Sequence, residues 1–241
     1  MTAKKVLITG ATSGIGLALV NQYSNNGHQV IACGRNKAKL AEISDQTHTN
    51  CIFDITSPQD IKQATHNIEN IDTLILNAGD CRYIDDAQHF DGALFADIIA
   101  TNLSSLGWLL HYLLPKVKRG GQVVFVSSSA TILPFPRSEA YGASKAGVDY
   151  LAKSLRLDLI NANIAVTLIH PGFVKTPLTD KNTFNMPFLM TSEEAAKRMF
   201  KGIEQRKSYL HFPKRLTYIM KIFSLLPLPL WQKIITRKHN P

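Results

Sequence analysis

The sequence has few cysteines, and their placement argues against several kinds of site. Cys33, Cys51 and Cys81 form no C-x-x-C pair and have no histidine at the spacing of a zinc site. We therefore expect neither a disulfide framework nor a bound metal. The first residues lead directly into the apolar Val6-Leu7-Ile8, which leaves no room for a signal peptide. A cytoplasmic protein is the expectation.

Acidic residues are missing from the C-terminal segment. The formal net charge of +9 is compatible with a nucleic-acid partner. However, no acid follows Glu204, and the segment after it holds eight of the 27 lysines and arginines: Arg206, Lys207, Lys214, Arg215, Lys221, Lys233, Arg237 and Lys238. The body of the chain is close to neutral, so no nucleic-acid partner is expected.

Short β-rich runs alternate with helix-length amphipathic stretches along residues 1–212. The pattern predicts strands near 5–9, 29–33, 50–53, 73–76, 121–127, 165–170 and 208–212, and helices near 15–26, 37–44, 58–67, 92–114, 138–161 and 192–204. Ser57-Pro58 and Thr191-Ser192-Glu193-Glu194 mark two helix starts. This order is typical of an α/β, Rossmann-type doubly wound parallel sheet with helices on both faces, in a single domain. Residues 213–241 form a basic and apolar extension of it.

A glycine-rich turn follows the first expected strand. Thr9-Gly10-Ala11-Thr12-Ser13-Gly14-Ile15-Gly16 lies between that strand and a helix-like run. Glycines permit a tight turn and a close backbone approach, so that the N–H groups of the helix N-terminus can face a pyrophosphate. The spacing differs from the general G-x-G-x-x-G pattern, and a merely structural turn is the alternative.

A tyrosine and a lysine lie four residues apart at the start of a long expected helix. Tyr141 and Lys145 therefore share one helix face. A phenol with a pKa of about 10 transfers protons poorly near neutrality, and a neighbouring positive charge stabilises its ionised form. Ser128 ends an apolar strand 13 residues before the tyrosine, and its neighbours Ser127 and Ser129 are alternatives. These residue types suit proton transfer to an oxygen.

Four other segments stand at strand ends or within a helix. Asn77-Ala78-Gly79 follows the strand near 73–76, Asp54 follows the strand near 50–53, Pro171-Gly172 with Val174 and Thr176 follows the strand near 165–170, and Asn102 lies inside the helix near 92–114. Alone, each has an ordinary interpretation as a turn, a helix cap or a surface residue.

Taken in order, these segments resemble the short-chain dehydrogenase/reductase family from residue 6 to about 212. The resemblance implies Tyr141 as general acid/base, Ser128 orienting the substrate carbonyl, Lys145 on the nicotinamide ribose, and Asn102 holding a water that links Lys145 to solvent. It implies a cofactor site made of Gly10, Thr12, Ser13, Gly14, Ile15, Gly16, Arg35, Asp54, Asn77, Ala78, Gly79, Tyr141, Lys145, Pro171, Gly172, Val174 and Thr176. It also implies a homodimer or homotetramer paired through helices 92–114 and 138–161.

The end of the second expected strand bears on the choice of cofactor. Gly34 stands where an acid would bind the 2′-hydroxyl of NAD, and no acid occurs before Glu42. Arg35 offers a planar, permanently charged fork suited to a 2′-phosphate, although a solvated surface arginine is the alternative. Ser13 lacks the extra basic residue of some NADP-using relatives. We therefore expect NADP(H) rather than NAD(H).

The expected function is that of an NADP(H)-dependent oxidoreductase that transfers hydride between the nicotinamide and a small-molecule carbonyl or secondary alcohol. Residues 173–190 are expected to form a loop or short helix, a candidate lid. Its apolar members either favour an apolar substrate or belong to the core: Phe173, Phe184, Met186, Pro187, Phe188, Leu189 and Met190. The alternative function is a non-catalytic nucleotide-sensing or interaction protein on the same fold.

The tail carries apolar residues at helical spacing, first Leu216, Ile219, Met220, Phe223 and Leu226 and then, beyond Pro227 and Pro229, Leu230, Trp231, Ile234 and Ile235. The uncharged run between Lys221 and Lys233 has 11 residues, whereas a membrane span needs about 20. The tail therefore either packs over the substrate cleft and the subunit interface, or makes peripheral contact with the anionic inner face of a membrane.

Overall fold

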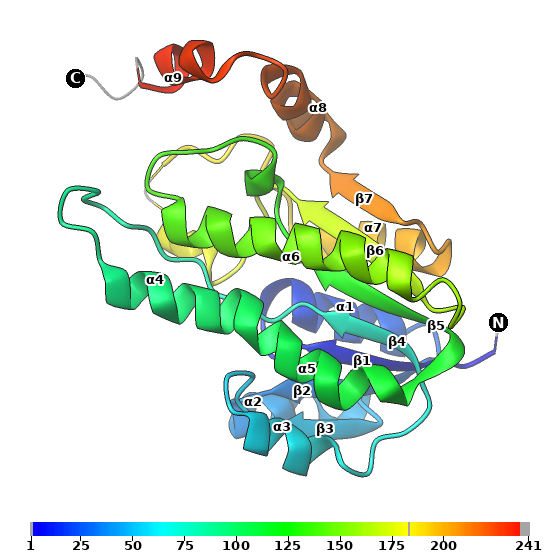
Figure 1. Cartoon of the computed structure of the whole chain (residues 1–241). Helices are drawn as coiled ribbons and strands as arrows, with labels where there is room; N and C mark the ends of the chain where they lie inside the picture. The colour runs from blue at the N-terminus through cyan, green and yellow to red at the C-terminus, as the bar shows by residue number, and fades with distance from the viewer. Residues whose placement is uncertain (1, 183, 237–241) are drawn as a thin grey trace.

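One parallel sheet runs through the protein, as the computed structural model of residues 2–182 and 184–236 shows (Figure 1). Its strands are β1 (Lys5–Thr9), β2 (Gln29–Gly34), β3 (Thr49–Ile52), β4 (Ile71–Leu76), β5 (Val117–Val126), β6 (Ala165–Pro171) and β7 (Tyr209–Phe212). The helices are α1 (Gly14–Ser24), α2 (Lys37–Glu42), α3 (Pro58–Thr65), α4 (Gly92–Ile99), α5 (Ser105–Leu113), α6 (Glu139–Asp158), α7 (Ser192–Glu204), α8 (Lys214–Phe223) and α9 (Leu228–Thr236). The predicted doubly wound α/β fold is confirmed.

The strand order is β3-β2-β1-β4-β5-β6-β7, and every pairing is parallel. The chain therefore reverses its direction of winding between β1 and β4. In open parallel sheets, ligands bind beyond the carboxyl ends of the strands at such a reversal. The topology alone places a candidate site next to Thr9 and Asn77.

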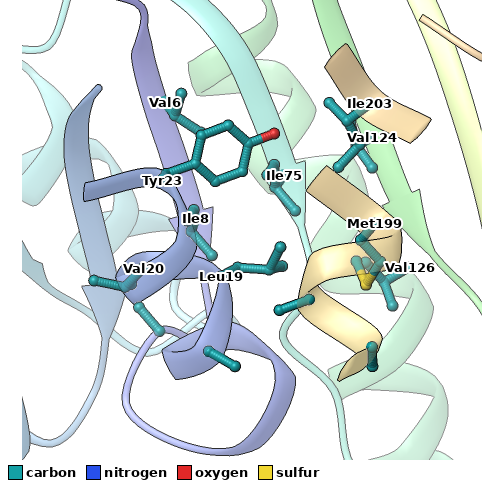
Figure 2. Close-up of a cluster of buried hydrophobic side chains, with 14 of the residues drawn as sticks. Val6, Ile8, Leu19, Val20, Tyr23, Ile75, Val124, Val126, Met199 and Ile203 are labelled. Carbon is teal, nitrogen blue, oxygen red and sulfur yellow. The ribbon is translucent and has the colours of Figure 1, made fainter. Parts of the chain in front are cut away.

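Successive side chains along each strand point to opposite faces of the sheet, so the core is divided into two clusters, one on each face. On β1, Val6 and Ile8 pack with α1 and α7, whereas Leu7 packs with α3, α5 and α6 on the opposite face. Figure 2 shows the first of these clusters, with the ring of Tyr23 from α1 lying against β1. Because both faces are covered, the strands read as nearly continuous apolar runs.

The β5 strand begins at Val117, four residues before the predicted start at 121. Gly120 adopts a φ of 83°, and the register with β4 shifts between Ile71 and Thr73. A left-handed residue of this kind lets a strand continue through an irregularity. The strand is therefore irregular at the Gly120-Gly121 pair, where the sequence pattern indicated its start.

The helix predicted over 92–114 is helical throughout but contains a π-helical turn at Ala100–Ser104, between α4 and α5. Within the described residues, Gly92–Lys116 is the one stretch that is long and apolar enough to cross a membrane by length and composition. Here α4 packs on α6 and α5 packs on the sheet, so the stretch is a helix of the folded domain.

Two helices follow the sheet in the C-terminal tail. The predicted break is present, because α8 ends at Phe223 and α9 begins at Leu228, with Pro229 in its first turn. Figure 1 shows α8 and α9 extending from β7 across the loop that precedes α6. The predicted Arg237 and Lys238 lie outside the described residues.

Both predicted helix caps are present. Ser57 caps α3, with Pro58 in the first turn, and the Thr191 hydroxyl accepts a hydrogen bond from the Glu194 N–H at 3.1 Å at the start of α7. These bonds satisfy N–H groups that lack a partner inside the helix.

Replacing Thr191 with alanine is expected to lower the free energy of unfolding by about 1 kcal/mol, because an N–H of α7 loses its acceptor. Thr191→Ser keeps the hydroxyl and should retain most of the stability. Urea denaturation of the three proteins measures the difference. Equal midpoints for Thr191→Ala and the wild type would show that this cap contributes nothing.

Candidate active site

Several of the residues selected from the sequence lie just beyond the carboxyl ends of four adjacent strands. Gly10 follows β1, Ser128 lies two residues beyond β5, and Gly172 directly follows β6. Asn77 directly follows β4, which lies between β1 and β5 in the sheet. Segments that are far apart in the chain are therefore brought to one edge of the sheet.

Thr9 joins the glycine turn to the Asn77-Ala78-Gly79 segment. Its hydroxyl accepts hydrogen bonds from the N–H groups of Asn77 at 3.0 Å and Ala78 at 3.1 Å, and the Asn77 amide donates to the Thr9 carbonyl at 3.0 Å. Gly10 has a φ of 67°, and a Cβ there would lie 2.9 Å from the Cα of Ala78. Thr9 was not predicted as a site residue from the sequence, although it is the first residue of the glycine-rich turn.

The first turn of α1 fits the pyrophosphate of a dinucleotide. In the described chain, Ser13 precedes this helix without a side-chain capping bond, and the first turn contains no acid. The backbone N–H groups in the first turn of α1 are therefore free to bind an anion, and the positive end of the helix dipole favours one. A Cβ on Gly16 would overlap the Gly10 carbonyl oxygen, and one on Gly14 would lie 2.8 Å from Cγ2 of Thr176. Ile15 packs against the core.

The two residues expected at the adenosine end of the cofactor lie together. Arg35 is largely exposed, and its guanidinium is 3.7 Å from the Asp54 carboxylate. Hydrogen bonds from the backbone and hydroxyl of Thr56 lower the pKa of Asp54 below its usual value, so this acid stays ionised. A Cβ at Gly34 would lie 2.9 Å from Cγ2 of Thr12, so this position has little room for an acidic side chain.

The segment after β6 is held by the edge strand β7 and by Met190. Gly172 donates its N–H to the Phe212 carbonyl at 2.6 Å, and Lys175 donates to Met190 at 2.8 Å. The side chain of Val174 lies in the core, so its backbone is the part available to a cofactor.

The described residues of this segment, 173–182 and 184–190, form the expected loop, with a short 3₁₀ turn at Thr179–Lys181. Phe184, Phe188 and Leu189 are exposed, whereas Met190 belongs to the core. The apolar residues of the segment therefore divide between the two interpretations that the sequence left open.

Tyr141 and Lys145 lie one turn apart at the start of α6, as their spacing predicts. The Lys145 ammonium is 5.9 Å from the centre of the Tyr141 ring and donates to the Val126 carbonyl at 3.0 Å. Burial raises the pKa of the Tyr141 phenol above its usual range, and the Ser128 hydroxyl offsets part of this shift. Burial lowers the pKa of Lys145 to about 8, against the opposing charge of Asp149.

The three neighbouring serines have different surroundings. The Ser127 hydroxyl donates to the Lys145 carbonyl at 3.2 Å and so faces the backbone of α6. Ser129 is buried at the start of a 3₁₀ turn. The Ser128 hydroxyl accepts a hydrogen bond from the Ala130 N–H at 3.1 Å. Its hydrogen bond with the Tyr141 phenol partly offsets the rise that burial causes in the pKa of that phenol. Of these serines, Ser128 has the position expected for a substrate-orienting hydroxyl.

Asn102 lies in the π-helical turn and is almost completely buried. Its oxygen accepts from the Asp80 N–H at 2.7 Å, while its amide donates to the Asp80 carbonyl at 2.8 Å and to the Ser144 hydroxyl at 3.0 Å. Single π-helical turns inside α-helices are frequent at functional sites. By these hydrogen bonds Asn102 ties the loop after β4 to α6.

A buried polar network behind Lys145 was missed by sequence analysis. His170 donates from Nε2 to Asp149 at 2.9 Å, which leaves Nδ1 to accept from the Tyr209 hydroxyl at 3.1 Å. Burial opposes ionisation of Asp149, but hydrogen bonds from His170, Ser127 and Thr131 bring the pKa of this carboxyl below its usual value. Asp149 lies one helical turn beyond Lys145, so a negative charge supports the ammonium. The i, i+4 spacing of Lys145 and Asp149 in the sequence could have indicated this pairing.

Comparison with known proteins now gives the family. The family model described as short chain dehydrogenase matches residues 4–187. The chain belongs to the short-chain dehydrogenase family. Its relatives are oxidoreductases, and this short-chain dehydrogenase is an oxidoreductase that uses a nicotinamide dinucleotide.

Two curated relatives of this dehydrogenase cover most of its length. An uncharacterized oxidoreductase of Myxococcus xanthus is 32% identical, over 98% of each chain. A serine 3-dehydrogenase of Rhizobium radiobacter is 32% identical, over 82% of this chain and 80% of the relative.

Two solved structures share the fold. A serine dehydrogenase complexed with NADP+ has a TM-score of 0.78 at 26% identity and covers 86% of this chain and 94% of its own. A 3-ketoacyl-(acyl-carrier-protein) reductase from Brucella melitensis complexed with NADH has a TM-score of 0.78 at 23% identity. The match covers 86% of this chain and 96% of the reductase chain. The cofactors of the two neighbours differ in the 2′-phosphate.

The activity of this short-chain dehydrogenase is expected to fall as the pH rises above about 8. Lys145, with its pKa lowered to about 8, is protonated below that value and loses its charge above it. The pH profile of kcat/KM reports the ionisation of groups in the free enzyme. It should show this fall as a descending limb above about pH 8. Lys145→Arg keeps its charge, so any remaining activity should lack this limb. A wild-type profile that is flat up to pH 10 would contradict the assignment.

Proposed function

We propose that the protein is an NADP(H)-dependent reductase or dehydrogenase that transfers hydride between the nicotinamide and a carbonyl or secondary alcohol of an apolar substrate. The observation that carries the proposal is a buried ammonium at Lys145 beside the partly buried phenol of Tyr141. Burying a charge is unfavourable unless it is paired, and a helix of a folded domain has no structural need for this pair.

The cofactor supplies the hydride when it is bound. In the reducing direction, the hydroxyls of Ser128 and Tyr141 donate hydrogen bonds to the substrate carbonyl oxygen and stabilise the negative charge that develops there. Tyr141 then gives its proton to that oxygen, and the positive charge of Lys145 stabilises the phenolate that remains. Oxidation of the alcohol reverses the proton transfer.

Aromatic side chains near Tyr141 support an apolar substrate. The rings of Tyr83 and Phe184 are 5.7 Å apart, and those of Phe173 and Phe184 are 6.0 Å apart. Burial raises the pKa of Tyr83 and that of the Cys81 thiol, so both stay neutral near pH 7. A wall of neutral and aromatic groups favours a carbonyl carried on an apolar body.

The preference for NADP(H) is supported by the exposed Arg35 beside Asp54 and by the narrow space at Gly34. Exposed apolar side chains on α5 and α6, namely Trp108 and Leu157, support a homodimer or homotetramer. Light scattering of the purified protein measures that assembly.

The second candidate, a nucleotide-binding protein without turnover, is supported by the glycine turn alone. Consumption of NADPH with a panel of aldehydes and ketones separates the two functions, because the second candidate predicts binding of NADPH without oxidation.

Tyr141→Phe is expected to reduce kcat by roughly a hundredfold or more, because the proton donor is removed from the transition state. Binding of NADPH should survive, because the ring is retained. Tyr150→Phe makes the same change at an exposed position of the same helix and should have no effect. Undiminished turnover by Tyr141→Phe would remove this residue from the catalytic role.

Arg35→Ala is expected to weaken NADPH binding roughly tenfold to a hundredfold, since a contact between charged groups is lost. NADH binding should change little. Lys62→Ala removes an exposed positive charge from α3. It controls for the general effect of lowering the net positive charge on nucleotide binding. Fluorescence titration with both nucleotides measures the effect, and a wild type that prefers NADH would argue against the assignment.

A further inference from the structure

The tail helices α8 and α9 are docked on the protein by one apolar face. Leu216, Met220 and Trp231 are buried against Leu133, and the Trp231 indole donates to the Pro134 carbonyl at 2.8 Å. The loop that they cover follows Ser128. A Cβ at Gly172 would lie 2.8 Å from Cδ2 of Leu216, so α8 also contacts the segment after β6. The tail therefore lies next to the candidate active site.

Other large apolar side chains of α8, the connecting turn and α9 are exposed to solvent, and together they are called the outer face here. Its large side chains are Tyr218, Ile219, Ile222, Leu225, Leu228, Leu230 and Ile234. Ile219 and Ile222 are one turn apart on α8, and Leu225 and Leu228 continue the series through the connecting turn. Leu225 is 83% exposed. The inner face accounts for the folding of the tail, but folding gives no reason for this outer face.

Basic side chains border the outer face. Lys214 and Arg215 at the start of α8 and Lys233 in α9 are exposed. The sequence contains no acid beyond Glu204, and among the described residues no ion pair involves Lys214, Arg215 or Lys233. An occupant of this surface must combine an apolar interior with negative charge.

We propose that the outer face of α8 and α9 binds the surface of an anionic lipid bilayer, with Ile219, Ile222, Leu225 and Leu228 inserted among the headgroups. A second copy fits less well, because a twofold interface would bring the same basic residues of both copies together. A bilayer supplies both the apolar layer and the anionic charge. The uncharged run of 11 residues between Lys221 and Lys233 is too short to span a membrane and long enough to lie on its surface.

Membrane binding would bring the aromatic residues near Tyr141 close to the lipid surface. An apolar carbonyl substrate could then pass from the bilayer to the site without crossing water. This consequence rests on the proposed function, whereas bilayer binding itself does not.

Flotation with vesicles tests the bilayer proposal on the full chain. Vesicles of phosphatidylcholine with 30% phosphatidylglycerol, at low salt, are expected to carry the wild-type protein, and pure phosphatidylcholine is expected to carry much less. Ile222→Asp should lower the partition at least about tenfold, because a charge replaces an exposed apolar group that would insert among the lipid headgroups. Ile160→Asp is the matched control, because Ile160 and Ile222 are each 66% exposed and Ile160 follows the far end of α6.

The charge component is tested by Arg215→Glu combined with Lys233→Glu, which should weaken binding and reduce its dependence on salt. NADPH binding, measured on every protein by fluorescence, shows that each variant is folded. A failure of turnover with intact vesicle binding would overturn the proposed function and leave this inference standing.

Three results would overturn the bilayer proposal. They are absence of wild-type binding to anionic vesicles at low salt, equal loss of binding in Ile160→Asp and Ile222→Asp, and unchanged binding in Ile222→Asp. A change of mass in light scattering for Ile222→Asp, without vesicle binding by the wild type, would instead identify the face as a contact between copies of the chain.

Discussion

The ammonium of Lys145, 6% exposed and hydrogen-bonded to the Val126 carbonyl at 3.0 Å, is a positive charge held inside the protein. A buried charge is tolerated when fixed groups surround it. The end of β5 supplies the carbonyl, α6 supplies Asp149, and His170 on β6 orients that carboxylate. The arrangement of the central strands and α6 is therefore tied to the same group that would stabilise the phenolate of Tyr141.

Two polar contacts extend this arrangement to the cofactor side. Asn102 binds the backbone of Asp80 through both the oxygen and the nitrogen of its side-chain amide, and the Thr9 hydroxyl accepts from the N–H groups of Asn77 and Ala78. The loop after β4 is thus fixed from α4–α5 on one side and from β1 on the other. Its backbone can pass close to both the glycine turn and Lys145 because Gly79 has no side chain; a Cβ there would lie 3.0 Å from the Asn102 oxygen.

The tail shows how one amphipathic segment can have two roles. Its inner face, with Trp231, completes the packing over the loop after Ser128, and its outer face leaves apolar and basic side chains in solvent. The sequence left packing and membrane contact as alternatives. The structure shows that packing uses one face of each helix, so the two interpretations are compatible, and the membrane contact stays a proposal.

The sequence by itself determined the elements, the parallel fold and the edge of the sheet at which the site lies. Those features follow from local periodicity, from turn residues such as Gly10, and from the i, i+4 spacing of Tyr141 and Lys145, which any α-helix converts into a shared face. Only the tertiary structure decided which of the three serines faces the phenol, that the Val174 side chain enters the core, and that His170 meets Asp149. These outcomes depend on burial and on contacts between residues far apart in the chain, which local patterns do not encode.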